Sequence, residues 1–402
     1  MRINPTDLKL LQEGQPPRDV SLLQAITFGQ DTWLNFVCDH YLRHYIATGG
    51  SKVKVLVGPQ GCGKTHMLRW LEQGARALGY ETVFLSARHT TNRLSNLPSF
   101  YQDIARQVDM EFLVAGLCRC VAEVLGFDSS RYDGTRRLLP LLIEDGLAPH
   151  IARRELRKAT QNAFRNADLG PSFQTFAWGA VETRVCAEDE FDALKGQIYR
   201  KWLRGEQLER KEKQQTYLFE RLEKSTARHW LNSLVALLRI AGRKGLLAVV
   251  DDLEVITERS EETGKFLYSR NAARDTCELF RQLIDDCEGL SGFLLLLAGR
   301  PPFIEDLKRG FASYEALWMR LQSGLIPSKI FNPFADMVDG KKHLEACGGD
   351  QFIQAVTERL RAVLAEAGMA PATHPVSFDA ERAGDLRAAV RTVTNLYGEE
   401  LR

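Results

Sequence analysis

Residues 58–65 read Gly-Pro-Gln-Gly-Cys-Gly-Lys-Thr, which matches the pattern G-x4-G-K-[S/T] of a phosphate-binding loop. Glycines allow the backbone to curl so that its N–H groups face a phosphate, and the positive end of the following helix adds attraction. Lys64 would neutralise the β- and γ-phosphate oxygens, and the Thr65 hydroxyl would bind Mg²⁺. A strand pattern precedes the loop and a helix pattern follows it, which disfavours a chance glycine-rich turn. The sequence therefore predicts a site for ATP and Mg²⁺ formed by Gly58, Pro59, Gln60, Gly61, Cys62, Gly63, Lys64, Thr65 and His66.

A second apolar run, Leu246–Val250, ends in the acids Asp251 and Asp252. Asp251 stands where P-loop ATPases hold Mg²⁺, so it is the predicted metal partner of Thr65, although a strand-end acid can also simply form a turn. Asp252 stands where most hydrolysing members carry a glutamate that orients the attacking water. Aspartate is one methylene shorter, and Glu254 could serve instead.

Arginines follow the later elements. The apolar run Phe293–Ala298 predicts a strand between those of the P-loop and of Asp251, and Arg300 after it is the predicted γ-phosphate sensor. Arg320 lies on a helix from which an arginine often reaches the nucleotide of the next subunit, with Arg270 and Arg274 as rivals. Each of these arginines could instead be an ordinary surface residue.

Arg387 follows Gly384-Asp385-Leu386 at the start of a C-terminal helix pattern. In ATPases of the AAA+ type, an arginine at a glycine-led helix start in the lid senses the nucleotide. Arg387 is therefore a predicted nucleotide contact. The alternative is a helix that begins after a turn, with Asp385 near its positive end.

Strand patterns alternate with helix patterns, which predicts an α/β fold: a P-loop, AAA+-like, doubly wound parallel sheet with a large helical insertion and a helical lid. The last strand is expected around Ser328–Phe331, and Gly29-Gln30 is expected at the adenine edge. A connection as long as 99–245 must be an inserted subdomain. We expect an N-terminal leader and helix at 1–50, core at 51–98, the helical insertion at 99–245, core again at 246–340, and the lid at 341–402.

Composition disfavours several classes of protein. The 402 residues carry a formal net charge of +1, so no global field draws the chain to nucleic acid or to a membrane. The eight cysteines form no C-x-x-C pair, which favours reduced thiols over disulfides or zinc. There is no signal-peptide pattern, and the apolar run GFLLLLAG is too short to cross a bilayer. These features predict a soluble, cytoplasmic protein.

The second half of the insertion is locally basic. Residues 195–245 contain thirteen Lys and Arg against five Asp and Glu. The aromatic residues among them, Tyr199, Trp202, Tyr217 and Trp230, could stack on bases while the cations follow a phosphate backbone. The same stretch alternates charge at helical spacing, which is also typical of a solvated helix or of a surface that contacts a partner protein.

Three segments carry a family resemblance: KWLRGE (Lys201–Glu206), AGRKGLLAVVDDLE (Ala241–Glu254) and YEALWMRL (Tyr314–Leu321). In this order they resemble the ATP-binding proteins of bacterial BREX-type phage-defence systems, the BrxC/BrxD type. The resemblance implies an AAA+-type ATPase that acts with other defence-system proteins and on double-stranded DNA. That family more commonly has Asp-Glu where this chain has Asp251-Asp252, which speaks against fast turnover and leaves ATP binding unaffected.

Two functions compete. The first is an oligomeric ATP-hydrolysing motor in which an arginine from one subunit completes the site of the next. The second is a nucleotide-gated scaffold or switch, in which ATP closes the lid, hydrolysis is slow, and a surface is presented to partners. A small-molecule kinase is disfavoured because the lid arginine and the insertion would serve no purpose in it.

Overall fold

The computed structural model describes residues 3–89, 94–128, 130–165, 167–185, 190–323, 331–370 and 385–398. Its centre is a five-stranded sheet in the order β2-β3-β4-β1-β5, in which every adjacent pair is parallel. The position of β4 between β1 and β3 confirms the order predicted for the strand that precedes Arg300. The strands are β1 (Ser51–Val57), β2 (Glu81–Ser86), β3 (Leu246–Asp251), β4 (Phe293–Gly299) and β5 (Met337–Asp339).

The sheet is covered on both faces, because alternate residues of each strand enter different clusters. Leu246, Ala248 and Val250 of β3 join one cluster, whereas Leu247 and Val249 join the other. The first cluster includes α5 (Leu97–Gln107), α12 (Ala227–Ile240) and α13 (Arg270–Asp285), and the second includes α3 (Leu34–Phe36), the helical segment η2 (Val37–Ile46) and α4 (Lys64–Ala77). The doubly wound α/β fold expected from the sequence is therefore the observed one.

The fifth strand differs from its prediction. It lies at Met337–Asp339 and pairs with β1. Phe331 is outside any strand, and residues 328–330 lie outside the described part of the chain. The strand has three residues, of which Val338 alone is buried, so it carries no apolar run by which a sequence pattern would reveal it.

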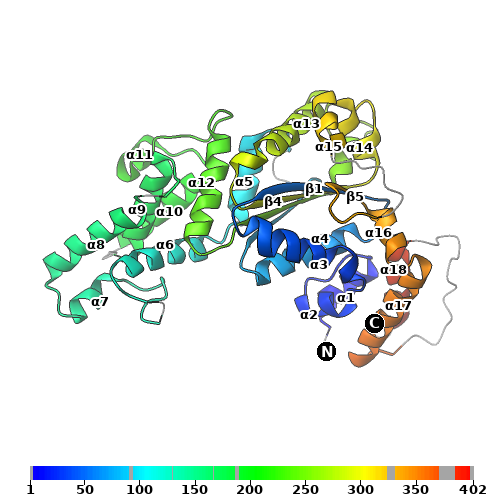
Figure 1. Ribbon diagram of the computed structural model, residues 1–402, viewed down its shortest axis with the longest axis horizontal. Coiled ribbons are helices and arrows are strands. Elements are labelled where there is room, and N and C mark those ends of the chain that lie inside the picture. Colours follow the sequence, from blue (N-terminus) through cyan, green and yellow to red (C-terminus); the bar gives the residue numbers. More distant parts are fainter. Residues whose placement is uncertain are drawn as a thin grey trace.

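The segment between β2 and β3 forms a helical lobe to one side of the sheet (Figure 1). Trp202 and Trp230 meet at its centre with their ring centroids 4.4 Å apart. These two residues and Tyr199 are 1%, 1% and 7% exposed, so the expectation that they stack on bases is wrong: they form the lobe's core. Besides α5 and α12, the lobe contains α6 (Met110–Val124), α7 (Leu139–Glu144), α8 (Pro149–Ala163), α9 (Pro171–Val185), α10 (Glu190–Leu203) and α11 (Arg210–Thr216).

The two ends of the described chain lie together (Figure 1). Leu8 and Leu11 of α1 (Pro5–Gln12) share an apolar cluster with Leu360 of α17 (Asp350–Glu366) and Val393 of α18 (Leu386–Gly398). The N-terminal helices and the C-terminal helices, which we name the lid after the role predicted for them, are therefore one packed unit. This unit also includes α2 (Val20–Ile26), and the lid begins with α16 (Gly340–Ala346).

Short elements complete the chain: η1 (Gln30–Thr32), η3 (Leu253–Ile256), η4 (Asp286–Gly289), α14 (Pro302–Glu305), η5 (Phe311–Ser313) and α15 (Glu315–Ser323). Within the described ranges, no helix combines the length and the apolar character that a membrane span requires.

Candidate nucleotide-binding site

The loop between β1 and α4 has the backbone that a phosphate cradle requires. Gly61 and Gly63 have φ of 86° and 90°, a region that favours glycine. A Cβ on Gly58 would come within 2.6 Å of the Cys62 sulfur. The positive φ values and the close approach of Gly58 to Cys62 explain why glycines occupy these positions. In this structure the Lys64 ammonium donates to the carbonyl oxygens of Gly58 and Pro59 at 2.8 and 2.9 Å.

The two predicted metal-binding residues are in direct contact. Thr65 Oγ1 donates to Asp251 Oδ2 at 2.7 Å, although the two residues are 186 positions apart in the chain. Asp251 is 3% exposed, and burial, with a smaller contribution from the Asp252 charge, raises its pKa to about 6. A hydroxyl and a carboxylate at this distance are the oxygen ligands that Mg²⁺ prefers, and Mg²⁺ takes its remaining ligands from water and substrate phosphates. No cluster of three or more His, Cys, Asp or Glu side chains suited to a metal occurs in the described ranges.

Asp252 follows directly in a left-handed conformation, with φ of 61°. Its N–H donates to Asp251 Oδ1 at 2.8 Å, and its carboxylate accepts a 2.5 Å hydrogen bond from Ser86 Oγ at the end of β2. The turn after β3 therefore points the second acid toward the neighbouring strand end. Ser86 is a contact that the sequence prediction missed, although a polar residue closing the strand next to Asp251 was the signal.

Arg300 and Glu254 form an ion pair across the ends of β4 and β3. Arg300 Nε donates to Glu254 Oε1 at 2.8 Å, and its backbone N–H donates to Oε2 at 3.1 Å. Glu258 accepts from Arg300 as well and from Arg88 at 2.6 Å, so the network continues to the end of β2. Glu254, 8% exposed, is here the partner of an arginine.

Arg387 reaches the N-terminal segment. Its guanidinium donates to the Glu13 carbonyl oxygen at 3.1 Å, and its backbone N–H donates to the Gly61 carbonyl oxygen at 3.3 Å. A Cβ on Gly61 would collide with the Asp385 carboxylate, so the first turn of α18 lies directly on the phosphate-binding loop. Gly384 lies outside the described residues. The Glu13 contact joins positions 374 apart, and no local pattern reveals it.

His66 connects α4 to the segment after α2. Its Nε2 lies 2.8 Å from Thr27 Oγ1, and this hydroxyl donates to the Leu23 carbonyl oxygen. Burial lowers the pKa of His66 to about 4, so the imidazole is neutral near pH 7. Because the threonine proton is engaged, His66 donates through Nε2. Gly29, expected at the adenine edge, packs against Phe352 of the lid.

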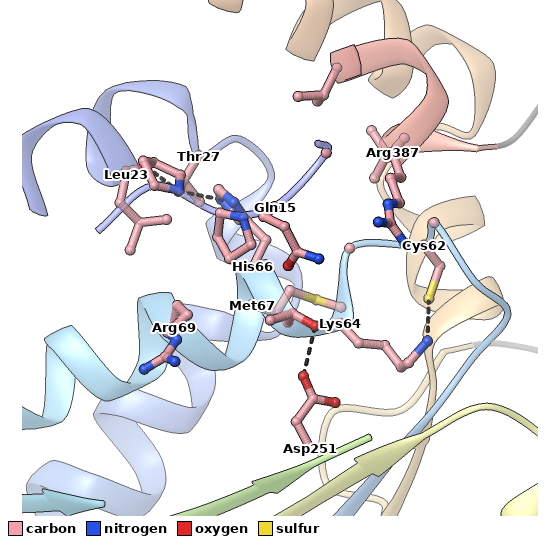
Figure 2. A pocket seen from close by; sticks show the side chains of 18 of the residues that line it. Gln15, Leu23, Thr27, Cys62, Lys64, His66, Met67, Arg69, Asp251 and Arg387 are labelled. Atoms are coloured by element: carbon pink, nitrogen blue, oxygen red, sulfur yellow. Dashed lines mark hydrogen bonds between the residues drawn. The ribbon is translucent and has the colours of Figure 1, made fainter. Parts of the chain in front are cut away.

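These elements surround one cavity of about 1050 Å³. Figure 2 shows Lys64 and Asp251 on its sheet side and Arg387 on its lid side. The rest of the lining includes apolar residues such as Leu23 of α2 and Phe352 of the lid, and charged residues such as Arg69 and Glu72 of α4. The predicted site residues that line it are Gln60, Gly61, Cys62, Gly63, Lys64, Thr65, His66, Asp251, Asp252, Glu254, Arg300 and Arg387.

The candidate trans-acting arginines lie elsewhere. Arg320 of α15 pairs with Asp285 at the end of α13 and is absent from the cavity lining. Arg274 lies with its guanidinium 6.0 Å from the Tyr314 ring centroid. Arg270, the first residue of α13, is exposed. These arginines lie on α13 and α15, away from the cavity of their own chain.

A family model described as "BREX system ATP-binding protein BrxC/D" matches residues 8–118 and 160–400. No curated protein sequence matches the chain. Among solved structures, the chain is similar to the Orc1 protein of Aeropyrum pernix in complex with DNA, at 11% sequence identity and a TM-score of 0.32. That match covers 95% of this chain and 63% of the Orc1 chain, so this chain spans less than two thirds of its length.

Proposed function

The chain belongs to the family of BREX system ATP-binding proteins of the BrxC/D type, and we propose that it binds ATP with Mg²⁺ and hydrolyses it as an AAA+-type ATPase. The observation that carries the proposal is the 2.7 Å contact between Thr65 of the P-loop and Asp251 at the end of β3. This contact lies in a cavity large enough for a nucleotide and reached by a lid arginine.

Each group in the cavity has a role in this proposal. The N–H groups of the curled loop and the Lys64 ammonium bind the phosphates. Thr65 and Asp251 would hold Mg²⁺, which would supply positive charge against the negative charge that develops during phosphoryl transfer. Asp252 orients the attacking water and accepts its proton. Arg300 and Arg387, which donate to Glu254 and Glu13 here, exchange these partners for phosphate oxygens.

A second candidate function is a nucleotide-gated scaffold with slow hydrolysis. It is favoured by the short Asp252 side chain and by its hydrogen bond to Ser86, which holds the carboxylate at the end of β2. In this case ATP closes the lid onto the loop, and the closed form recruits other defence-system proteins.

We extend the proposal to assembly and localisation. Arg320, Arg270 or Arg274 would complete the site of an adjacent subunit in a homo-oligomer, since each lies outside the cavity of its own chain. The assembly would work in the cytoplasm with partner effectors and on double-stranded DNA, as the family's place in phage defence suggests.

The test is ATP turnover by the purified protein, with and without double-stranded DNA, at two protein concentrations, with Lys64→Ala as the control. The motor predicts turnover that rises with DNA and more than linearly with protein concentration. The scaffold predicts tight ATP binding with negligible turnover in every condition. If Lys64→Ala bound ATP as well as the wild type, the assignment of the site would be wrong.

A further inference from the structure

The connection between α11 and α12 presents two large aromatic side chains to solvent. Tyr217 is 73% exposed and Phe219 is 60% exposed, whereas Thr216 and Leu218 are buried at 1% and 0%. Arg221, two residues after Phe219, is exposed as well. We call Tyr217, Phe219 and Arg221 the aromatic ledge.

The backbone at the ledge is unusual. Tyr217 ends α11 with φ of 58°, and among the described residues other than glycine it shares a positive φ only with Asp252 of the nucleotide site. Its N–H donates to the Lys213 carbonyl oxygen at 2.8 Å, which closes the helix. Glycine would adopt this conformation without strain. A strained tyrosine whose ring makes little contact with the protein is explained by what the ring can bind outside it.

The core of the lobe holds the ledge rigidly. Trp202 Nε1 donates to the Glu220 carbonyl oxygen at 2.9 Å, and Trp230 Nε1 donates to the Glu220 carboxylate at 2.8 Å. A Cβ on Gly205 would collide with Leu222. Trp202 and Gly205 belong to the KWLRGE segment, which takes no part in the nucleotide site. Its structural role is to fix the ledge.

Charge around the ledge favours an anionic ligand. Arg210 and Lys211 are exposed on α11, and Arg221 and Lys224 are exposed after it. Of the acids between these cations, Glu212 pairs with Lys201 at 2.9 Å and Glu220 accepts from Trp230, while Glu223 is exposed. The net charge of the exposed side chains beside the two rings is therefore positive.

We propose that the aromatic ledge binds single-stranded nucleic acid, with bases stacked on Tyr217 and Phe219 and phosphates beside the four exposed cations. Rings on a rigid support next to cations suit unpaired bases, since every base has a face that can stack. Duplex DNA presents its bases edge-on in the grooves and offers no such faces. The site does not depend on ATP binding, because the ledge is separate from the nucleotide cavity.

The experiment is fluorescence anisotropy of labelled oligothymidylate and oligouridylate titrated with the full chain. Tyr217→Gly and Phe219→Ala should each weaken binding about tenfold or more. Tyr217→Gly should at the same time leave the thermal midpoint unchanged or raised, because glycine relieves the positive φ. Comparing the two oligonucleotides separates a DNA ligand from an RNA ligand.

Two control variants isolate the effect. Tyr45→Ala removes another exposed tyrosine, 46% exposed and outside the lobe, and should leave binding unchanged. Lys64→Ala should also leave it unchanged, so failure of the nucleotide proposal and failure of this one are distinguishable. Absence of binding by the wild type, or wild-type affinity in both ledge variants, overturns the proposal. If unlabelled duplex DNA displaced the labelled oligonucleotide as well as unlabelled single strands did, binding would depend on charge alone, and the proposal would be overturned too.

Discussion

Ser86 donates a 2.5 Å hydrogen bond to the carboxylate of Asp252 across the ends of the paired strands β2 and β3. The acid that stands in the position of the hydrolytic base is thus held by a neighbouring strand. Ser86 therefore links the end of β2, where the helical lobe departs from the core, to the position of the Asp252 carboxylate in the nucleotide site.

The first prediction concerns Asp252. We expect Asp252→Asn to lower ATP turnover by about 100-fold or more, since it removes the proposed general base, and to leave ATP affinity close to that of the wild type. Single-turnover hydrolysis and equilibrium binding of a fluorescent ATP analogue measure the two quantities. Asp252→Glu is the informative partner: a protein tuned for slow hydrolysis should turn over faster with the longer side chain. Wild-type turnover in Asp252→Asn would remove this residue from the mechanism.

The second prediction separates Glu254 from Asp252. Glu254 is buried and accepts two hydrogen bonds from Arg300. We expect Glu254→Ala to lower the free energy of unfolding by about 2 kcal/mol, because it leaves these donors without their acceptor. Urea titrations measure this loss. In them the free energy of unfolding of Asp252→Asn, a change at the cavity surface, should stay within about 0.5 kcal/mol of the wild-type value. An intact fold with abolished hydrolysis in Glu254→Ala would identify Glu254 as the base instead.

The third prediction concerns the lid. Arg387 donates to the Glu13 carbonyl oxygen and lines the nucleotide cavity. We expect Arg387→Ala to weaken ATP binding about tenfold, through loss of a charge-assisted contact, and to abolish ATP-dependent protection from trypsin. Arg361→Ala, an exposed arginine of α17, is the matched control and should behave as the wild type. Equal protection in both variants would make Arg387 an ordinary helix-start residue.

Local patterns predicted most of the nucleotide site. The loop at 58–65 and the strand ending in Asp251 each carry their signal within about ten residues, because a cradle and a buried strand are local structures. The contact of Arg387 with Glu13 joins segments that are distant in the chain, so composition and spacing could not reveal it. For the contact of Asp252 with Ser86, the polar residue at the end of β2 was a local signal, but the pairing of β2 with β3 is not a local property. The aromatic residues near Lys201 were misjudged for a related reason. A tryptophan beside lysines has the same local pattern whether it lies in the core of the lobe or on its surface.

The fourth prediction is a pH dependence that arises from His343. This residue is 5% exposed, lies between the rings of Trp33 and Phe331, and burial lowers its pKa to about 4. In the unfolded chain this histidine binds a proton near pH 6.5, whereas in the folded chain it does so only near pH 4. The free energy of unfolding is therefore unaffected by His343 above about pH 6.5 and decreases as pH falls from about 6.5 toward 4. The loss amounts to about 3 kcal/mol at most.

Urea titrations at several pH values check this dependence. His343→Phe has no proton to bind, so its free energy of unfolding should gain on that of the wild type as pH falls from about 6.5 to 4. His44→Asn, at an exposed position of η2, should follow the wild type throughout. A constant difference between His343→Phe and the wild type over this range would show that His343 does not titrate as its burial requires.

The fifth prediction concerns Lys54, a lysine of β1 that is 1% exposed. Its ammonium donates to three consecutive carbonyl oxygens, those of Pro333, Phe334 and Ala335, at 3.3, 3.3 and 2.8 Å. It therefore holds the segment that leads into β5 and, at Gly340, into the lid. We expect Lys54→Met to lower the free energy of unfolding by about 2 kcal/mol, because three carbonyl groups lose their donor in a partly buried site. The control is Lys52→Met, two residues earlier on β1, which breaks a partly exposed ion pair with Asp336. It should lower the free energy of unfolding by less than about 1 kcal/mol. If the two variants lost equal stability, the carbonyl groups would have another donor, and the lid would not depend on Lys54 for its attachment to the sheet.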